Sequence, residues 1–96
     1  MKLKALLSGI PGGCRIIGDQ ETEITSLCVD SRKAEPGCLF FCTPGTVQDA
    51  HDFAPQAVAN GAVALLVQRE LPLNCAQVLV EDVRVAGSYV AANYYG

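Results

Sequence analysis

The sequence predicts an α/β fold in which a small, mixed and partly parallel sheet is flanked by helices. Five short apolar runs have strand character, and most are bounded by glycine, proline or acidic residues. The run at 38–43 is followed by a polar loop, a helical segment and a second apolar run at 62–67, which is the order of a parallel strand–helix–strand unit. The chain has 96 residues, enough for a single domain, 1–96, with one modest core.

Each expected strand follows from its apolar residues. The five runs are 15–17, 24–29, 38–43, 62–67 and 76–80. In the second run, Ile24, Leu27 and Val29 are the larger apolar members, and their imperfect alternation predicts partial cover on both faces. The third and fourth runs are unbroken, which is typical of central strands buried on both sides. Between the second and third runs, Pro36-Gly37 predicts a tight turn.

Helices are expected at three places. The first ten residues indicate a short amphipathic helix with three leucines inward: Leu3, Leu6 and Leu7. A second helix is predicted at 53–60 with Asp52 as its N-cap. A third is predicted at 83–95, capped by Asp82 and with apolar residues at helical spacing, although Gly87 weakens it by about 1 kcal/mol relative to alanine.

The composition and charge of the chain limit the kinds of partner that it is expected to bind. The hydrophobic fraction is 50%, so the chain is expected to fold. The net charge of −3 and the scattered basic residues argue against nucleic acid and anionic membrane surfaces, which both reward clustered lysine and arginine. No stretch reaches the ~20 apolar residues of a membrane helix, and no complete signal peptide is recognised at the start, so a cytoplasmic location is expected.

The cysteines are expected to be reduced thiols. Their number, five, is odd, and no secretion signal accompanies them. Cys38 and Cys42 have a spacing that invites a metal or disulfide interpretation, but a strand between them would separate their Cα atoms by about 13 Å, and a disulfide needs roughly 7 Å or less. A redox or metal protein is therefore the least favoured interpretation.

Candidate site residues gather after the second and third strands. Asp30, Ser31 and Arg32 leave one strand, and the loop at 44–51 leaves the next and opens a helix. Ligands of open α/β sheets collect beyond the carboxyl ends of the strands, and a helix N-terminus suits a phosphate. Ser31 and Arg32 could hold phosphate oxygens; equally, Asp30 and Arg32 could pair with each other while Ser31 shapes a turn.

The residues do not form a complete active site. The only histidine, His51, precedes the predicted helix, so a role in helix entry or loop packing is favoured over general-base chemistry. No serine or cysteine stands in a nucleophile pattern, and the chain has no phosphate-binding loop of the Gly-x-x-x-x-Gly-Lys-Ser/Thr type.

The stretch V-D-S-R-K-A-E-P-G-C-L-F-F-C-T-P-G-T-V-Q-D-A-H-D-F, at 29–53, resembles the N-terminal domain of Mur ligases, most closely of the MurE type. The resemblance continues through A-V-A-N-G-A-V-A-L-L-V, V-L-V-E-D-V-R and A-A-N-Y-Y-G, and covers nearly the whole chain. It implies a small sheet of the MurE and MurF N-terminal kind. It also implies a part in peptidoglycan synthesis, and so in cell-wall biogenesis, cell shape and cell division.

In that family the N-terminal domain binds the uridine-diphosphate end of UDP-N-acetylmuramoyl-dipeptide. ATP, Mg²⁺ and amino-acid selection belong to two later domains, so the resemblance implies a binding domain of a longer ligase that is not catalytic alone. By position, the family's nucleotide contacts and the residues shaping the site fall on Val29, Asp30, Ser31, Arg32, Thr46, Val47 and Gln48.

Two departures from the family pattern bear on this site. Ala50 stands where the family has glycine, which would cost about 1 kcal/mol if that position needs positive φ. Cys38 stands where an acidic residue is usual. Two alternatives stay open: the MurF-type ligase that adds the terminal dipeptide, and a free-standing nucleotide-sugar binding module.

Overall fold

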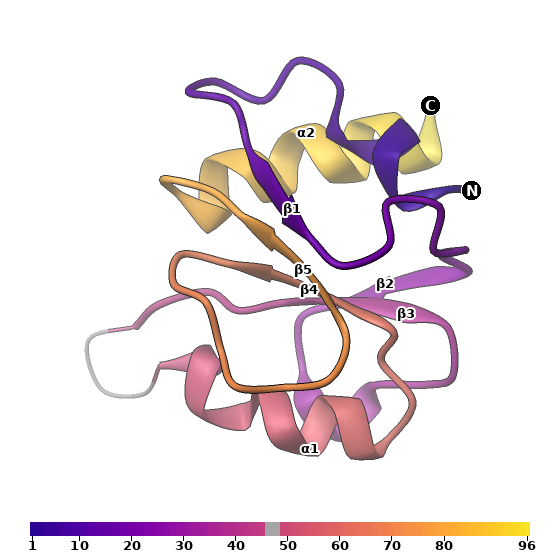
Figure 1. Cartoon of the computed structure of the whole chain (residues 1–96), viewed down its shortest axis with the longest axis vertical. Coiled ribbons are helices and arrows are strands. Elements are labelled where there is room, and N and C mark those ends of the chain that lie inside the picture. Colours follow the sequence, from indigo (N-terminus) through magenta and orange to yellow (C-terminus); the bar gives the residue numbers. More distant parts are fainter. Residues whose placement is uncertain (46–48) are drawn as a thin grey trace.

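The computed structural model describes residues 1–45 and 49–96, and in this part of the chain a five-stranded sheet forms the centre of the fold (Figure 1). The strands are β1 (Arg15–Ile17), β2 (Ser26–Cys28), β3 (Cys38–Phe41), β4 (Ala64–Val67) and β5 (Ala76–Leu79). Their order is β1-β5-β4-β3-β2. Strand β1 is antiparallel to β5 and the other neighbours are parallel, which confirms the mixed, partly parallel sheet.

Strands β3 and β4 are the buried centre of this sheet, as their unbroken apolar sequences predicted. All residues of both strands are buried, and Leu39 of β3 is paired with Ala64 of β4. Because side chains alternate along a strand, Leu39 and Phe41 join one core cluster and Cys38 and Phe40 join the other. The sheet therefore needs apolar cover on both faces.

Helices supply this cover from opposite sides (Figure 1). Helix α2 (Val83–Tyr95) and the short 3₁₀ helix η1 (Leu3–Leu7) lie on one face, and α1 (Ala54–Ala59) lies on the other. In η1, Leu3 and Leu6 are fully buried as predicted, whereas Leu7 is only partly buried.

Helix α2 has the predicted bounds and the predicted cap. The Asp82 carboxylate accepts hydrogen bonds from the backbone N–H groups of Arg84, at 2.9 Å, and Val85, at 3.2 Å. Its buried stripe includes Gly87, where a Cβ atom would lie only 2.9 Å from Cε2 of Phe41. Glycine at this position therefore lets the helix approach β3 closely, and this offsets its low helix propensity.

The predicted start of the helix after β3 is wrong. The helical segment begins earlier, with the 3₁₀ helix η3 (Ala50–Phe53), which runs directly into α1. Its N-cap is Asp49, whose carboxylate accepts from His51 N–H at 2.9 Å, and Asp52 lies inside the first turn. Asp49 has the extended backbone that an N-cap requires (φ −107°, ψ 119°).

The strand predicted at 24–29 is shorter than expected. β2 ends at Cys28, and Val29 is 70% exposed instead of packed in the sheet. The chain then forms the 3₁₀ helix η2 (Ser31–Lys33) and a turn in which Cys38 N–H donates to Glu35 C=O at 3.1 Å. The early end of β2 is what releases Val29 to the surface.

The cysteine side chains are free thiols, and Cys38 and Cys42 are fully buried. Burial raises the pKa of the Cys42 thiol to about 12, which makes it a poor nucleophile. No group of three metal-ligating side chains is found among residues 1–45 and 49–96. Over the same residues, every helix is too short or too polar to span a membrane.

Candidate functional site

An open cavity of about 570 Å³ lies where the parallel strands β2 and β3 end. This volume is within the usual range for small-molecule sites, roughly 300–1,000 Å³. The residues that line it come from the ends of the two strands, from η2 and from the helical segment after β3: Val29, Asp30, Ser31, Arg32, Phe40, Thr43, Ala50, Phe53 and Gln56.

Four of the predicted site residues meet in this cavity. Val29, Asp30, Ser31 and Arg32 line it in one continuous run. The other predicted contacts, Thr46, Val47 and Gln48, lie outside the described residues. The rule that ligands collect beyond parallel strand ends therefore pointed to the edge of the sheet where the cavity is found.

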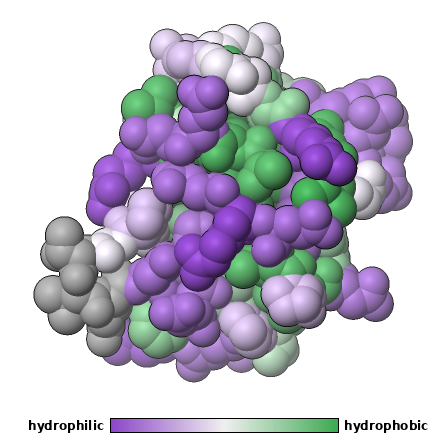
Figure 2. All heavy atoms as spheres, turned by 60° about the vertical axis from the view of Figure 1, so that its left-hand side comes forward, coloured by the Kyte–Doolittle hydropathy of each residue, from purple (hydrophilic) through white to green (hydrophobic). Residues whose placement is uncertain are grey.

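Apolar side chains form the mouth and the floor of the cavity. Val29 is 70% exposed and Phe53 is 38% exposed, whereas Phe40 is 1% exposed and forms part of the floor. Figure 2 shows one face of the molecule, on which hydrophilic side chains surround smaller hydrophobic areas. Exposed apolar groups beside a cavity suit a ligand with a flat, weakly polar part.

Asp30 and Arg32 pair with each other at the rim. Asp30 accepts from Arg32 backbone N–H at 3.0 Å, from Nε at 3.1 Å and from Nη2 at 3.0 Å. These hydrogen bonds hold the pKa of the Asp30 carboxyl below its usual value and raise the pKa of Arg32. Of the two interpretations that the spacing left open, the structure shows the pairing, with Asp30 as the N-cap of η2.

Ser31 is turned toward α1 and away from solvent. It is 6% exposed, its Oγ donates to Gln56 Oε1 at 2.9 Å, and its carbonyl accepts from Asn60 Nδ2 at 3.1 Å. The hydroxyl proton is therefore committed to Gln56 and is not directed at a phosphate oxygen. These two contacts fasten η2 to α1 across the cavity.

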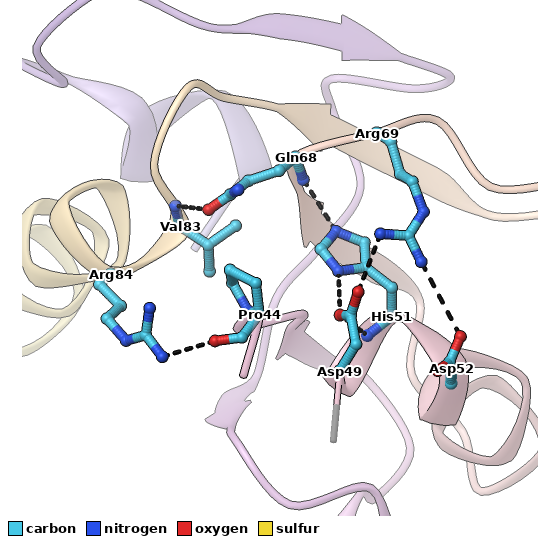
Figure 3. Close-up of polar contacts among 8 residues, drawn as sticks. All are labelled: Pro44, Asp49, His51, Asp52, Gln68, Arg69, Val83 and Arg84. Atoms are coloured by element: carbon cyan, nitrogen blue, oxygen red, sulfur yellow. Dashed lines mark hydrogen bonds and ion pairs between the residues drawn. The ribbon is translucent and has the colours of Figure 1, made fainter. Parts of the chain in front are cut away.

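His51 joins the start of the helical segment to the end of β4 (Figure 3). It is 2% exposed, and its Nε2 accepts from Gln68 backbone N–H at 2.9 Å. Because Nε2 is an acceptor, the ring proton is on Nδ1, which donates to Asp49 Oδ1 at 2.7 Å. The predicted role of His51 in helix entry is confirmed by these contacts.

Asp49 is the centre of this network. Besides the backbone and ring of His51, it accepts from Arg69 Nη1 at 2.9 Å (Figure 3). The hydrogen bonds from His51, and then the one from Arg69, hold the pKa of Asp49 well below its usual value. Asp49 therefore stays ionised at all physiological pH values.

The other end of the loop is held by α2. Arg84 Nη2 donates to the carbonyl of Pro44, and Gln68 Oε1 accepts from Val83 N–H at 2.9 Å (Figure 3). Arg84 of α2 thus anchors the loop before residues 46–48. After them it is anchored by the Arg69 side chain and the Gln68 backbone N–H, which both follow β4. The anchors come from segments that are far from the loop in the sequence.

A phosphate site at the start of the helix after β3 gains no support. Helix α1 has six residues, and the N–H of His51 at the start of the preceding turn already binds the Asp49 carboxylate. That end of the helical segment therefore carries a negative charge of the chain's own.

The two departures from the family pattern do not disturb the cavity. Ala50 lies within η3, and none of the described residues other than glycine has positive φ, so the expected conformational cost is absent. Cys38 is fully buried in β3 and is not part of the cavity lining.

The sequence reasoning missed Phe53 and Gln56 as lining residues. Their spacing of three residues on a helix was the available signal, because Ala54 and Ala57 take the buried face and leave these two on another. Phe40, Thr43 and Ala50 gave no comparable signal, since a strand residue or a small loop residue lines a cavity only once its neighbours are placed.

Comparison with known proteins gives a consistent set of relatives. The sequence profile described as "Mur ligase family, catalytic domain" matches residues 23–94. The UDP-N-acetylmuramoyl-L-alanyl-D-glutamate--2,6-diaminopimelate ligase of Geobacillus thermodenitrificans is 46% identical over 96 residues, covering 100% of this chain and 19% of the relative. The ligase of the same description from Halalkalibacterium halodurans is 43% identical, covering 100% of this chain and 20% of the relative.

A solved structure shares the fold. The crystal structure of MurF from Acinetobacter baumannii superposes with a TM-score of 0.82 at 35% identity, covering 96% of this chain and 20% of that chain. The chain thus spans about a fifth of the length of the relatives it matches.

Proposed function

Because this chain belongs to the Mur ligase family, we propose that it is the substrate-binding domain that holds the UDP end of UDP-N-acetylmuramoyl-dipeptide. The observation that carries this proposal is the cavity at the ends of β2 and β3, lined by Val29, Asp30, Ser31 and Arg32. Its apolar mouth suits a nucleobase, and its polar rim suits the ribose.

The activity of the whole protein would be the addition of the third peptide residue in peptidoglycan synthesis. The curated relatives named above carry 2,6-diaminopimelate in their descriptions, which makes it the favoured amino acid. A cytoplasmic location accords with a nucleotide-linked substrate, and the net charge of −3 accords with a partner that is neither nucleic acid nor an anionic membrane.

ATP and Mg²⁺ would be held elsewhere in the longer protein. The sequence has no Gly-x-x-x-x-Gly-Lys-Ser/Thr loop, and the described residues assemble no group of three metal-ligating side chains. The described residues therefore fit neither ATP nor Mg²⁺. We therefore propose that residues 1–96 form one binding domain, followed by ATP-binding and C-terminal ligase domains that carry the chemistry.

The MurF type is the alternative, because solved MurF structures are among those that match. The MurE type is favoured because curated sequences with the diaminopimelate ligase description reach 46% identity over the whole chain. A free-standing binding module is the other alternative. The natural reading frame separates it from a ligase: a phosphate-binding loop soon after Gly96 supports the ligase.

The test is an amide NMR titration of the chain with UDP-muramoyl dipeptide and with UDP. We expect shifts of residues 29–32 and of Phe53 and Gln56 with both ligands, with Kd of about 1 mM, equivalent to about −4 kcal/mol. Absence of shifts at 10 mM ligand, roughly ten times that Kd, would contradict the proposal.

A pair of matched variants locates the site. Val29→Glu places a carboxylate at the cavity mouth and should abolish the shifts, since Val29 is exposed and its replacement leaves the core intact. Val85→Glu makes the same change at an exposed valine of α2, outside the cavity, and should bind UDP as the wild type does.

A further inference from the structure

The side-chain amide of Gln56 is held at its oxygen end by a neighbouring hydroxyl. Its Oε1 accepts from the buried Ser31 hydroxyl at 2.9 Å, and the residue lines the cavity from α1. We propose that Gln56 is the residue that selects uracil, by donating from Nε2 to the exocyclic O4 of the base, and that Ser31 is a positioning residue for it. This inference rests on the proposed function.

The orientation of the Gln56 amide is set by its neighbours. Ser31 is 6% exposed and is itself held through its carbonyl by Asn60 Nδ2 at 3.1 Å and through η2 by the Asp30 cap. A hydroxyl fixed in this way has Gln56 Oε1 as its acceptor, so the oxygen end of the amide is occupied. The Nε2 end is then the part of Gln56 that offers hydrogen-bond donors to a ligand.

A donor at this place discriminates between the two pyrimidines. Position 4 carries a carbonyl acceptor in uracil, as in thymine, and an amino donor in cytosine. An Nε2 donor therefore gains a hydrogen bond with uracil and meets an opposing donor in cytosine. Val29 and Phe53, both exposed at the cavity mouth, provide apolar surface for the faces of the ring.

The inference predicts a preference that one substitution alters. Wild-type chain is expected to bind UDP roughly threefold to tenfold more tightly than CDP, the value of one net hydrogen bond. Gln56→Glu keeps an acceptor for Ser31 but replaces the donor by a second acceptor, so the preference should disappear or reverse toward CDP. The ratio of the two Kd values is the readout, because the added charge weakens both diphosphates alike.

Gln20→Glu is the matched control. Gln20 is exposed in a turn on the α2 side of the sheet, where its carbonyl accepts from the backbone N–H of Lys4. The substitution therefore adds the same negative charge away from the cavity. This variant should keep the wild-type ratio. Ser31→Ala should lower the preference for UDP over CDP, because the Gln56 amide then loses the hydrogen bond that fixes its orientation.

The binding results distinguish a failure of this inference from a failure of the proposed function. If the wild type binds neither nucleotide, the proposed function and this inference both fail. If it binds UDP but the UDP-to-CDP ratio is close to one, or the ratio is unchanged in Gln56→Glu, the inference fails and the proposed function stands.

Discussion

His51→Phe tests whether the network at the end of β4 stabilises the fold. The His51 ring is 2% exposed and makes two hydrogen bonds, to Asp49 through Nδ1 and from Gln68 N–H through Nε2. Phenylalanine has a ring of similar size, so the substitution removes both hydrogen bonds without opening a large cavity.

The expected cost comes from these two bonds. Asp49 keeps its contacts with the His51 backbone and Arg69, so it loses one charge-assisted bond, worth about 1.5 kcal/mol. Gln68 N–H loses its acceptor, which costs about 1–3 kcal/mol. The sum is about 3 kcal/mol, a large part of the roughly 5–14 kcal/mol expected for a domain of this size.

Urea unfolding followed by circular dichroism measures this loss. We expect a lower midpoint with an unchanged m value, and a Tm lower by roughly 12–24 °C. Asp52→Asn is the control, because Asp52 is exposed and its Oδ1 lies 3.8 Å from Arg69 Nη2, so it should cost less than about 1 kcal/mol. A loss below about 1 kcal/mol in His51→Phe would refute the reasoning.

Two further predictions concern the packing of the core and the loss of stability at low pH. Gly87→Ala should destabilise the chain by about 1–2 kcal/mol in urea unfolding, because the new Cβ would lie 2.9 Å from Phe41 Cε2 and the overpacking exceeds the gain of about 1 kcal/mol in helix propensity; a more stable variant would contradict this. The pKa of Asp49 is lowered in the folded state, so its stabilising contribution is complete above the unfolded pKa of about 3.9 and is lost as the pH falls toward the folded value. Unfolding curves between pH 6 and pH 2.5 should therefore show a shallower loss of stability in Asp49→Asn than in wild type, and equal slopes would count against this role of Asp49.

The sequence by itself determined the elements whose signals are local. The unbroken apolar runs of β3 and β4 predicted buried central strands, and Asp82 followed by apolar residues at helical spacing predicted α2 with its observed bounds. The family was also predicted, because motif spacing is a property of the chain alone. The order of strands and helices along the chain likewise placed the candidate residues beyond the carboxyl ends of two strands, where the cavity is found.

Only the tertiary structure decided how the site residues are engaged. Asp49 and Asp52 are both good capping residues, and the choice between them depends on His51 and Arg69, which are fixed by the end of β4. Ser31 and Gln56 are separated by 25 positions and meet because η2 packs against α1 beside the cavity. Such contacts carry no local signal, since hydrogen-bond partners distant in the sequence are set by packing and not by the propensity of either segment.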